Sequence, residues 1–510
     1  MISATVNSSC KDNQQEILLM KLKLPKAKPG LIPFVGILIA LYIFSKAGIS
    51  SFTHDESYSY LHYPHDSFIK IISFSNWFMN NHILNSLFMK YSEQLWGNSE
   101  FALRLPNLFL MVVYMFYSYR LFQNKNSILS VAIFCILCTN VLMMDLFGLA
   151  RGYGLSFGFM LMSLYHFLAY LKKNKKVDLA VFHFAALLAV LSHFTLLLAY
   201  ISLLLLFNVV KILESRFGGA EKFHLFKTNK PNIIPILLNT IILYEPLRRA
   251  ISYGDFSVGG KSGFYSDTVT HFIYNIFDGI EISSPILFVL QVLFTFIIVI
   301  PLFIIVKNIS ERKTVFIYNH KGLIVTNFLL LIISIILILQ HLILRTDYPI
   351  DRFSIFLFPI FSIHFGFFIN YLIETSYKKT ILVITSFIAL AAIINFGKRA
   401  DLHASAGWTY DSETKNMIQT LISTRKMNND NSKNIRLSVN WLFEPTINFY
   451  RITKGLDWLL PIDRNSAGKT DDYYYIFENE PCPLSASEYE IIKKFENTKT
   501  ILIKHKTASD

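Results

Sequence analysis

The sequence predicts a polytopic α-helical membrane protein, with about eleven transmembrane helices and a small C-terminal α/β domain. Three observations support this fold class. The chain of 510 residues is 53% hydrophobic and only 16% charged, which is too apolar for an ordinary soluble enzyme. Apolar runs long enough to cross a bilayer recur along most of the chain. Beyond Phe396 the composition becomes polar and rich in Asn and Asp.

Each long apolar run is expected to form one span, beginning with Leu31–Ile49, which is retained because no small-residue cleavage site follows it. The run 178–213 is too long for one helix, so we expect two crossings that turn near Ser192 and His193. The other expected spans are residues 101–122, 127–147, 153–171, 233–247, 284–306, 323–344, 353–373 and 381–396.

Basic residues lie in short clusters between the apolar runs, so the net charge of +13 indicates membrane topology and argues against nucleic acid as a partner. Alternate connections assigned to the cytoplasm hold 22 Lys and Arg residues, whereas those assigned outside hold ten. This asymmetry predicts a cytoplasmic N-terminal tail (1–30), a membrane domain (31–396) and an extracytoplasmic α/β domain (397–510).

Two outer loops are long, at residues 51–100 and 248–283. The first contains two amphipathic stretches: one carries Phe68 and Met79, and the other runs from Leu84 to Leu95. They fit helices lying along the membrane interface or helices packed on the bundle. In the C-terminal domain we expect strands at 435–439, 473–477 and 500–503, and helices at 411–424 and 487–495.

Two carboxylates, Asp55 and Glu56, directly follow the first span at its outer end. Arginines recur at the outer ends of other spans, at Arg104, Arg151 and Arg352. A cation buried in a helical bundle needs a partner, so this pattern indicates an outer anion-binding cavity. The alternative is that each arginine reaches the lipid headgroups.

Several short motifs resemble the GT-C glycosyltransferases, in particular the branch of protein O-mannosyltransferases and lipid A aminoarabinose transferases. The resemblance covers about residues 30–370. In chain order, the motifs are His54-Asp55-Glu56, Asn81-His82, the stretch from Gly97 to Pro106, Ala150-Arg151-Gly152-Tyr153, Ser192-His193-Phe194-Thr195 and Asp351-Arg352-Phe353. Family members usually have prolines after the histidine of the first loop, whereas Ile83 and Leu84 follow His82 here.

The resemblance implies a polyprenyl-phosphate-linked sugar as donor, transfer to an acceptor hydroxyl with inversion, and a location in the cytoplasmic (inner) membrane. Asp55 can accept the proton of the acceptor, and Glu56 can orient Asp55 or bind the acceptor. The leaving group is already a phosphate, so it needs no protonation, only cations that neutralise its charge. The expected donor-phosphate ligands are Arg104, Arg151, Lys261 and Arg352, and the expected substrate contacts are His54, His82, Tyr153 and His193.

The sequence is also compatible with other functions. A transporter or lipid-carrier flippase would have the same spans, and so would an assembly scaffold without catalysis. The acceptor can be a lipid, a glycan or a protein. A divalent metal is the one cofactor that the sequence leaves open, with Asp55, Glu56 and His54 as potential ligands.

Overall fold

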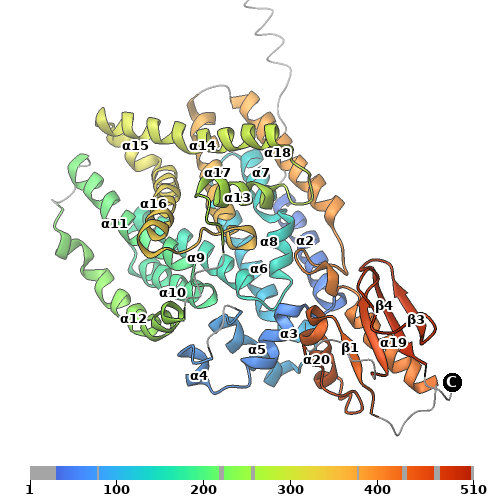
Figure 1. Ribbon diagram of the computed structural model, residues 1–510. Helices are drawn as coiled ribbons and strands as arrows, with labels where there is room; N and C mark the ends of the chain where they lie inside the picture. The colour runs from blue at the N-terminus through green and yellow to red at the C-terminus, as the bar shows by residue number, and fades with distance from the viewer. Residues whose placement is uncertain are drawn as a thin grey trace, which may run out of the picture.

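The computed structural model describes residues 30–76, 80–217, 223–253, 259–375, 378–427, 434–464 and 471–506. Most of these residues are helical, and one small sheet lies near the C-terminal end (Figure 1). The predicted combination of a helical membrane part and a small C-terminal sheet is therefore confirmed.

Eight helices of the described residues are long and apolar enough to cross a membrane. They are α2 (Leu31–Ile49), α6 (Glu100–Phe122), α9 (Gly152–Lys173), α11 (Leu196–Phe217), α14 (Ser284–Ser310), α16 (Lys321–Leu344), α17 (Leu357–Thr375) and α18 (Lys378–Arg399). A ninth candidate is the pair α7 (Ser127–Cys138) and α8 (Val141–Phe147), which is bent by 67° between its halves. These helices make the chain an integral membrane protein.

Two further predicted spans fall on helices outside this set. α10 (Lys176–Ser192) has 17 residues, and α12 (Leu225–Ser252) contains three prolines and is less apolar. The expected break within residues 178–213 is confirmed, because α10 ends at Ser192 and α11 begins at Leu196. His193 between them has an extended backbone, with φ −158° and ψ 113°.

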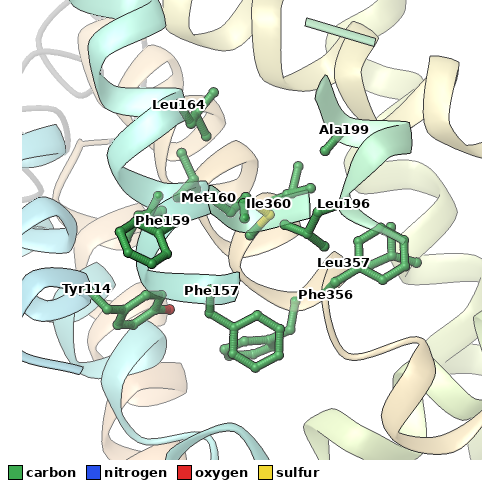
Figure 2. Close-up of a cluster of buried hydrophobic side chains, with 14 of the residues drawn as sticks. Tyr114, Phe157, Phe159, Met160, Leu164, Leu196, Ala199, Phe356, Leu357 and Ile360 are labelled. Atoms are coloured by element: carbon green, nitrogen blue, oxygen red, sulfur yellow. The ribbon is translucent and has the colours of Figure 1, made fainter. Parts of the chain in front are cut away.

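The helices pack around one large apolar core. Figure 2 shows part of it, where side chains of α9, α11 and the start of α17 meet. Within a bilayer, lipid is as apolar as these side chains, so helix association depends on close packing. Gly158 supplies such a contact, since a Cβ there would lie 2.8 Å from the carbonyl oxygen of Leu110 in α6.

The first long loop folds into three short helices, α3 (His54–His62), α4 (Phe68–Ile72) and α5 (Ile83–Trp96). α5 is the amphipathic stretch expected from Leu84 to Leu95, and it packs against α6 through buried Leu84 and Leu87, while Leu95 is exposed. Met79 lies outside the described residues. The second loop contains a π-helical turn (Tyr265–Val269) and α13 (Thr270–Ile276). α15 (Thr314–Asn319) connects α14 to α16 and lies far from α3 and α4 (Figure 1).

The C-terminal sheet has the order β1-β2-β4-β3, with β1 parallel to β2 and the other pairs antiparallel. Its strands are β1 (Leu437–Val439), β2 (Tyr473–Phe477), β3 (Tyr489–Phe495) and β4 (Thr500–His505), and its helices are α19 (Thr414–Met427) and α20 (Glu444–Thr453). The helix expected at residues 487–495 is wrong, because most of this stretch is β3. Its backbone pairs with β4 across a short turn, and this cross-strand pairing overrides the helical spacing.

The C-terminal domain packs on the first loop, beside α3 (Figure 1). The rings of Phe52 and Phe449 stack at 4.2 Å, and the hydroxyl of Tyr450 accepts a hydrogen bond from the backbone N–H of Phe52. A buried carboxylate joins the domain to the membrane helices: Asp145 in α8 pairs with Lys46 in α2 at 2.6 Å and accepts the N–H of Ala406. The domain therefore forms part of the same end of the bundle as Asp55.

Candidate functional site

The site is organised around the start of α3. Thr53 caps the helix, and its side chain and backbone exchange hydrogen bonds with Glu56 in a capping box. Asp55 and Glu56 thus occupy consecutive positions in the first helical turn, about 100° apart around the helix axis. The two carboxylates consequently face different surroundings.

Glu56 points into the protein and is fully buried together with Arg104. Its oxygens accept from the Nε and Nη2 of Arg104 at 2.8 and 2.7 Å and from the N–H of Ala150 at 2.6 Å. The remaining N–H groups of Arg104 donate to Ser50, Ser51 and the carbonyl of Ala47. This bidentate pair joins the end of α2, the start of α6 and the segment before α9.

Asp55 faces a second arginine cluster. Its Oδ2 lies 3.4 Å from Nη2 of Arg151 and 3.1 Å from Nη2 of Arg352, yet it has no hydrogen bond of good geometry. The Asp55 side chain is 15% exposed and that of Arg352 is 33% exposed, whereas Arg151 is buried. The Oδ2 of Asp55 is therefore covered between two guanidinium groups, and Arg352 is the more accessible of the two arginines.

Backbone oxygens and a hydroxyl hold Arg151 in place. Its Nη1 lies within hydrogen-bond distance of the carbonyls of Asp55 and Asn80 and of the hydroxyl of Ser59. Its Nε is buried without a partner among the described residues. The guanidinium is thus fixed in position while one donor stays unused.

Gly152, directly after Arg151, permits a close approach of three segments. A Cβ at this position would lie 2.1 Å from the carbonyl oxygen of Ser192 and 2.5 Å from Cγ of His82. The α10–α11 turn and the start of α5 can thus contact the start of α9 only because residue 152 lacks a side chain.

We expect Gly152→Ala to separate these segments, displace Arg151, lower the thermal midpoint and reduce activity. Gly397→Ala is the matched control, since nothing lies within 4 Å of its Cβ position and the change should leave both properties unaltered. Melting curves and activity of the two purified variants check this. Equal behaviour of the two would contradict the packing role of Gly152.

Three expected substrate contacts meet beside the arginines. His82 and His193 stack at 5.3 Å, and the ring of Tyr153 lies 5.4 Å from His82 and 4.7 Å from His193. Burial and the nearby charges of Arg151 and Arg352 lower the pKa of His193 to about 3 and hold the pKa of His82 well below its usual range. Both rings are therefore neutral at physiological pH.

Two other predicted residues lie apart from this cluster. The Nδ1 of His54 is 2.7 Å from the carbonyl oxygen of Leu442, so its ring faces the C-terminal domain. Lys261 is exposed and follows the backbone bridge between Gly260 and Tyr348, which brings its loop to the segment that precedes Arg352.

The expected metal ligands do not converge. Glu56 is occupied by Arg104, His54 faces Leu442, and Asp55 faces two arginines. Within the ranges given above, no three His, Cys, Asp or Glu side chains are grouped so that they could hold a metal ion.

The C-terminal domain contributes residues that the sequence analysis did not assign to the site. The guanidinium of Arg352 lies over the ring of Trp408, 4.7 Å from its centroid. The charges of Asp55 and Arg352 both act on Tyr410, and that of Asp55 on the buried carboxyl of Asp411. In the sequence, this contribution could have been inferred from the aromatic and acidic residues that cluster just after the last apolar run.

Burial raises the pKa of Asp411 to about 8, against the hydrogen bonds that its carboxylate accepts from the N–H of His54 and the hydroxyl of Thr414. A raised carboxyl pKa favours folding at low pH, so stability should fall as pH rises from about 4 towards 8. Asp411→Asn should flatten this slope in melting curves recorded from pH 5 to 9. An unchanged slope in the variant would exclude Asp411 as its source.

Comparisons with known proteins bear on the family and the fold. Residues 82–228 match the family model described as dolichyl-phosphate-mannose-protein mannosyltransferase. ArnT from Cupriavidus metallidurans bound to undecaprenyl phosphate has a similar structure, with a TM-score of 0.51 and 8% identity over 94% of this chain and 99% of that chain. The apo structure of the same ArnT gives 0.47 and 10% identity over 92% and 97%. No curated protein matches the sequence.

The matched segment contains His82, Arg151, Tyr153 and His193, which lie together beside Asp55. The chain therefore resembles the GT-C glycosyltransferases of the protein mannosyltransferase and aminoarabinose transferase branch, as its motifs predicted, and it has the fold of ArnT.

Proposed function

We propose that this protein is a membrane glycosyltransferase that moves a sugar from a polyprenyl-phosphate-linked donor to an acceptor hydroxyl, with inversion at the anomeric carbon. One observation carries the proposal. A partly exposed carboxylate, Asp55, lies between the guanidinium groups of Arg151 and Arg352, on a fold shared with an enzyme whose structure contains undecaprenyl phosphate.

The arrangement supplies both charges that the reaction needs. The donor phosphate would compete with Asp55 for the two guanidinium groups and release Oδ2 of Asp55. The acceptor oxygen then forms a bond to the anomeric carbon, the bond from that carbon to the phosphate oxygen breaks, and the acceptor proton moves to Asp55. The polyprenyl phosphate leaves with additional negative charge, which the arginines stabilise.

Glu56 and Arg104 have positioning roles in this proposal, which departs from the expectation drawn from the sequence. All N–H groups of Arg104 already have acceptors inside the protein, so a donor phosphate could bind it only by displacing Glu56. Breaking a buried ion pair costs several kcal/mol, roughly 3–5. The pair instead fixes the turn that presents Asp55.

The proposed topology has eleven crossings in the cytoplasmic membrane. The nine candidates together with α10 and α12 make up this number, and the basic clusters then lie on the cytoplasmic side. The N-terminus is cytoplasmic, and Asp55 and the C-terminal domain lie outside. The donor-phosphate site is formed by Arg151 and Arg352, with Lys261 on a neighbouring loop, and Tyr153, His82 and His193 border it.

Arg352 provides a sharp test of the phosphate site, because it is the more accessible of the two guanidinium groups. We expect Arg352→Gln to lower the rate of transfer roughly a hundredfold, as removal of a charge-stabilising donor does in other enzymes. Arg352→Lys should restore part of that loss. The exposed Arg345 belongs to the same connection, and Arg345→Gln should transfer sugar at the wild-type rate.

The experiment that tests the function is mass spectrometry of envelope glycans, glycolipids and proteins from cells with and without the gene. Loss of one sugar from one class of molecule would support the proposal and identify the acceptor. An unchanged set of glycans, together with movement of lipid carrier across vesicles containing the purified protein, would instead indicate a flippase.

A further inference from the structure

A second polar site lies at the end of the bundle opposite to Asp55. Between the ends of α6 and α9 and the segments α15, α16 and α17 there is a pocket of about 520 Å³. Both α6 and α9 begin at the Asp55 site and end at this pocket. A helix of the length of α9 spans ~33 Å, close to the hydrocarbon thickness of a bilayer. The pocket therefore lies at the level of the other leaflet's headgroups.

The lining of this pocket is strongly basic. Arg120, Lys125, Lys172, Lys173 and Lys321 line it, and Glu374 is the one carboxylate among its described lining residues. Glu374 also accepts a hydrogen bond from Asn370. Across the part of the chain that the structure describes, Lys125, Lys172 and Lys173 have no carboxylate within ion-pair distance. Several positive charges thus converge without an internal counter-ion.

The guanidinium group of Arg120 is held in a fixed orientation at this pocket. Its Nη2 donates to the hydroxyl of Tyr165 at 2.9 Å, and its guanidinium lies 5.5 Å from the centre of the Tyr165 ring. Its Nε is buried with no partner in the described chain. Lys321, which also lines the pocket, is held by Glu214 and by the carbonyl oxygen of Leu171. The two cations are fixed in place before any ligand binds.

The apolar part of the lining indicates what kind of anion binds. Leu121, Leu168 and Phe367 face the same pocket as the basic side chains. Phe367 packs closely over Gly322, where a Cβ would lie 2.6 Å from its ring. A soluble anion would make no contact with these apolar surfaces. A lipid can place its phosphate among the cations and its acyl chains along the apolar side chains.

We propose that this pocket binds the phosphate headgroup of an anionic phospholipid from the leaflet opposite the Asp55 site. Arg120, Lys125, Lys172 and Lys173 hold the phosphate, and Leu121, Leu168 and Phe367 contact the first part of the acyl chains. The inference does not depend on the proposed enzymatic function, because it concerns a different end of the molecule. Bound lipid would balance the converging charges and join α6, α9 and α16.

The test measures thermal stability and bound lipid of the full-length protein in phosphatidylcholine vesicles, with and without phosphatidylglycerol. We expect phosphatidylglycerol to raise the melting temperature and to remain bound in native mass spectra. Arg120→Gln and Lys173→Gln should each weaken its binding about fivefold, as expected for one interfacial charge. Lys307→Gln is the matched control, an exposed lysine at the same end of the bundle that does not line the pocket.

Three results would contradict the proposal. Equal stabilisation by inorganic phosphate in phosphatidylcholine would show that the pocket binds a soluble anion. Equal loss of phosphatidylglycerol binding in Lys307→Gln would show a general surface effect. If Arg120→Gln fails to fold, Lys125→Gln is measured in its place, and wild-type lipid binding by both lysine variants would exclude the pocket.

Discussion

Replacing Asp55 with Asn should reduce sugar transfer by about 10²–10⁴-fold while the protein still inserts and folds. The carboxylate is the only acidic side chain beside both Arg151 and Arg352 in the described structure, so the amide would leave no group to accept the proton of the acceptor. Its Oδ2 accepts no hydrogen bond of good geometry, and its two ion pairs are 3.1 and 3.4 Å long, so the loss of this charge should cost less stability than the loss of the tightly paired Arg104.

Asp66→Asn is the matched control for this experiment. Asp66 belongs to the same loop, its side chain is 27% exposed, and it pairs only loosely with the exposed Lys70, at 3.8 Å. Initial rates with a polyprenyl-phosphate sugar should be unchanged in this variant. Wild-type rates in Asp55→Asn would remove Asp55 from the reaction.

Replacing Arg104 with Gln should have the largest effect on stability, a loss of about 3–5 kcal/mol, because the charge of Glu56 would stay buried without a partner. The double variant Glu56→Gln/Arg104→Gln should recover part of that loss, since neither charge then remains. Unfolding of the reconstituted protein in denaturant checks both expectations.

The exposed pair Glu245–Arg248 provides the comparison, and Arg248→Gln should leave the unfolding midpoint unchanged. The alternative role of Arg104 has a different signature. If Arg104→Gln kept the wild-type midpoint and weakened only the binding of the donor, Arg104 would belong to the phosphate site, as its sequence context predicted.

The sequence predicted most of the long apolar helices, because the length of an apolar run is a local property. Periodicity and run length were enough to predict the break at Ser192, the helix α11 that follows it and the amphipathic helix α5. The strand β3 could not, because its conformation depends on pairing with β4.

At the site, sequence reasoning identified the groups but not their orientation. Asp55 and Glu56 are adjacent in the chain, yet helix geometry turns one towards the arginines and the other into the protein. Arg104 and Arg151 likewise occupy similar positions at helix starts, and only the tertiary structure shows that one has all its donors satisfied. Trp408 and Asp411 belong to the C-terminal domain and reach the site through tertiary contacts: Asp411 accepts a hydrogen bond from the backbone N–H of His54, 357 positions earlier in the chain.

The most direct test uses purified protein in vesicles with a radiolabelled polyprenyl-phosphate sugar and the acceptor found by mass spectrometry. We expect wild-type protein to form labelled product with inverted anomeric configuration, Arg345→Gln to match it, and Asp55→Asn to form almost none. Movement of label across the membrane without covalent product, or full product formation by Asp55→Asn, would contradict a transferase centred on Asp55.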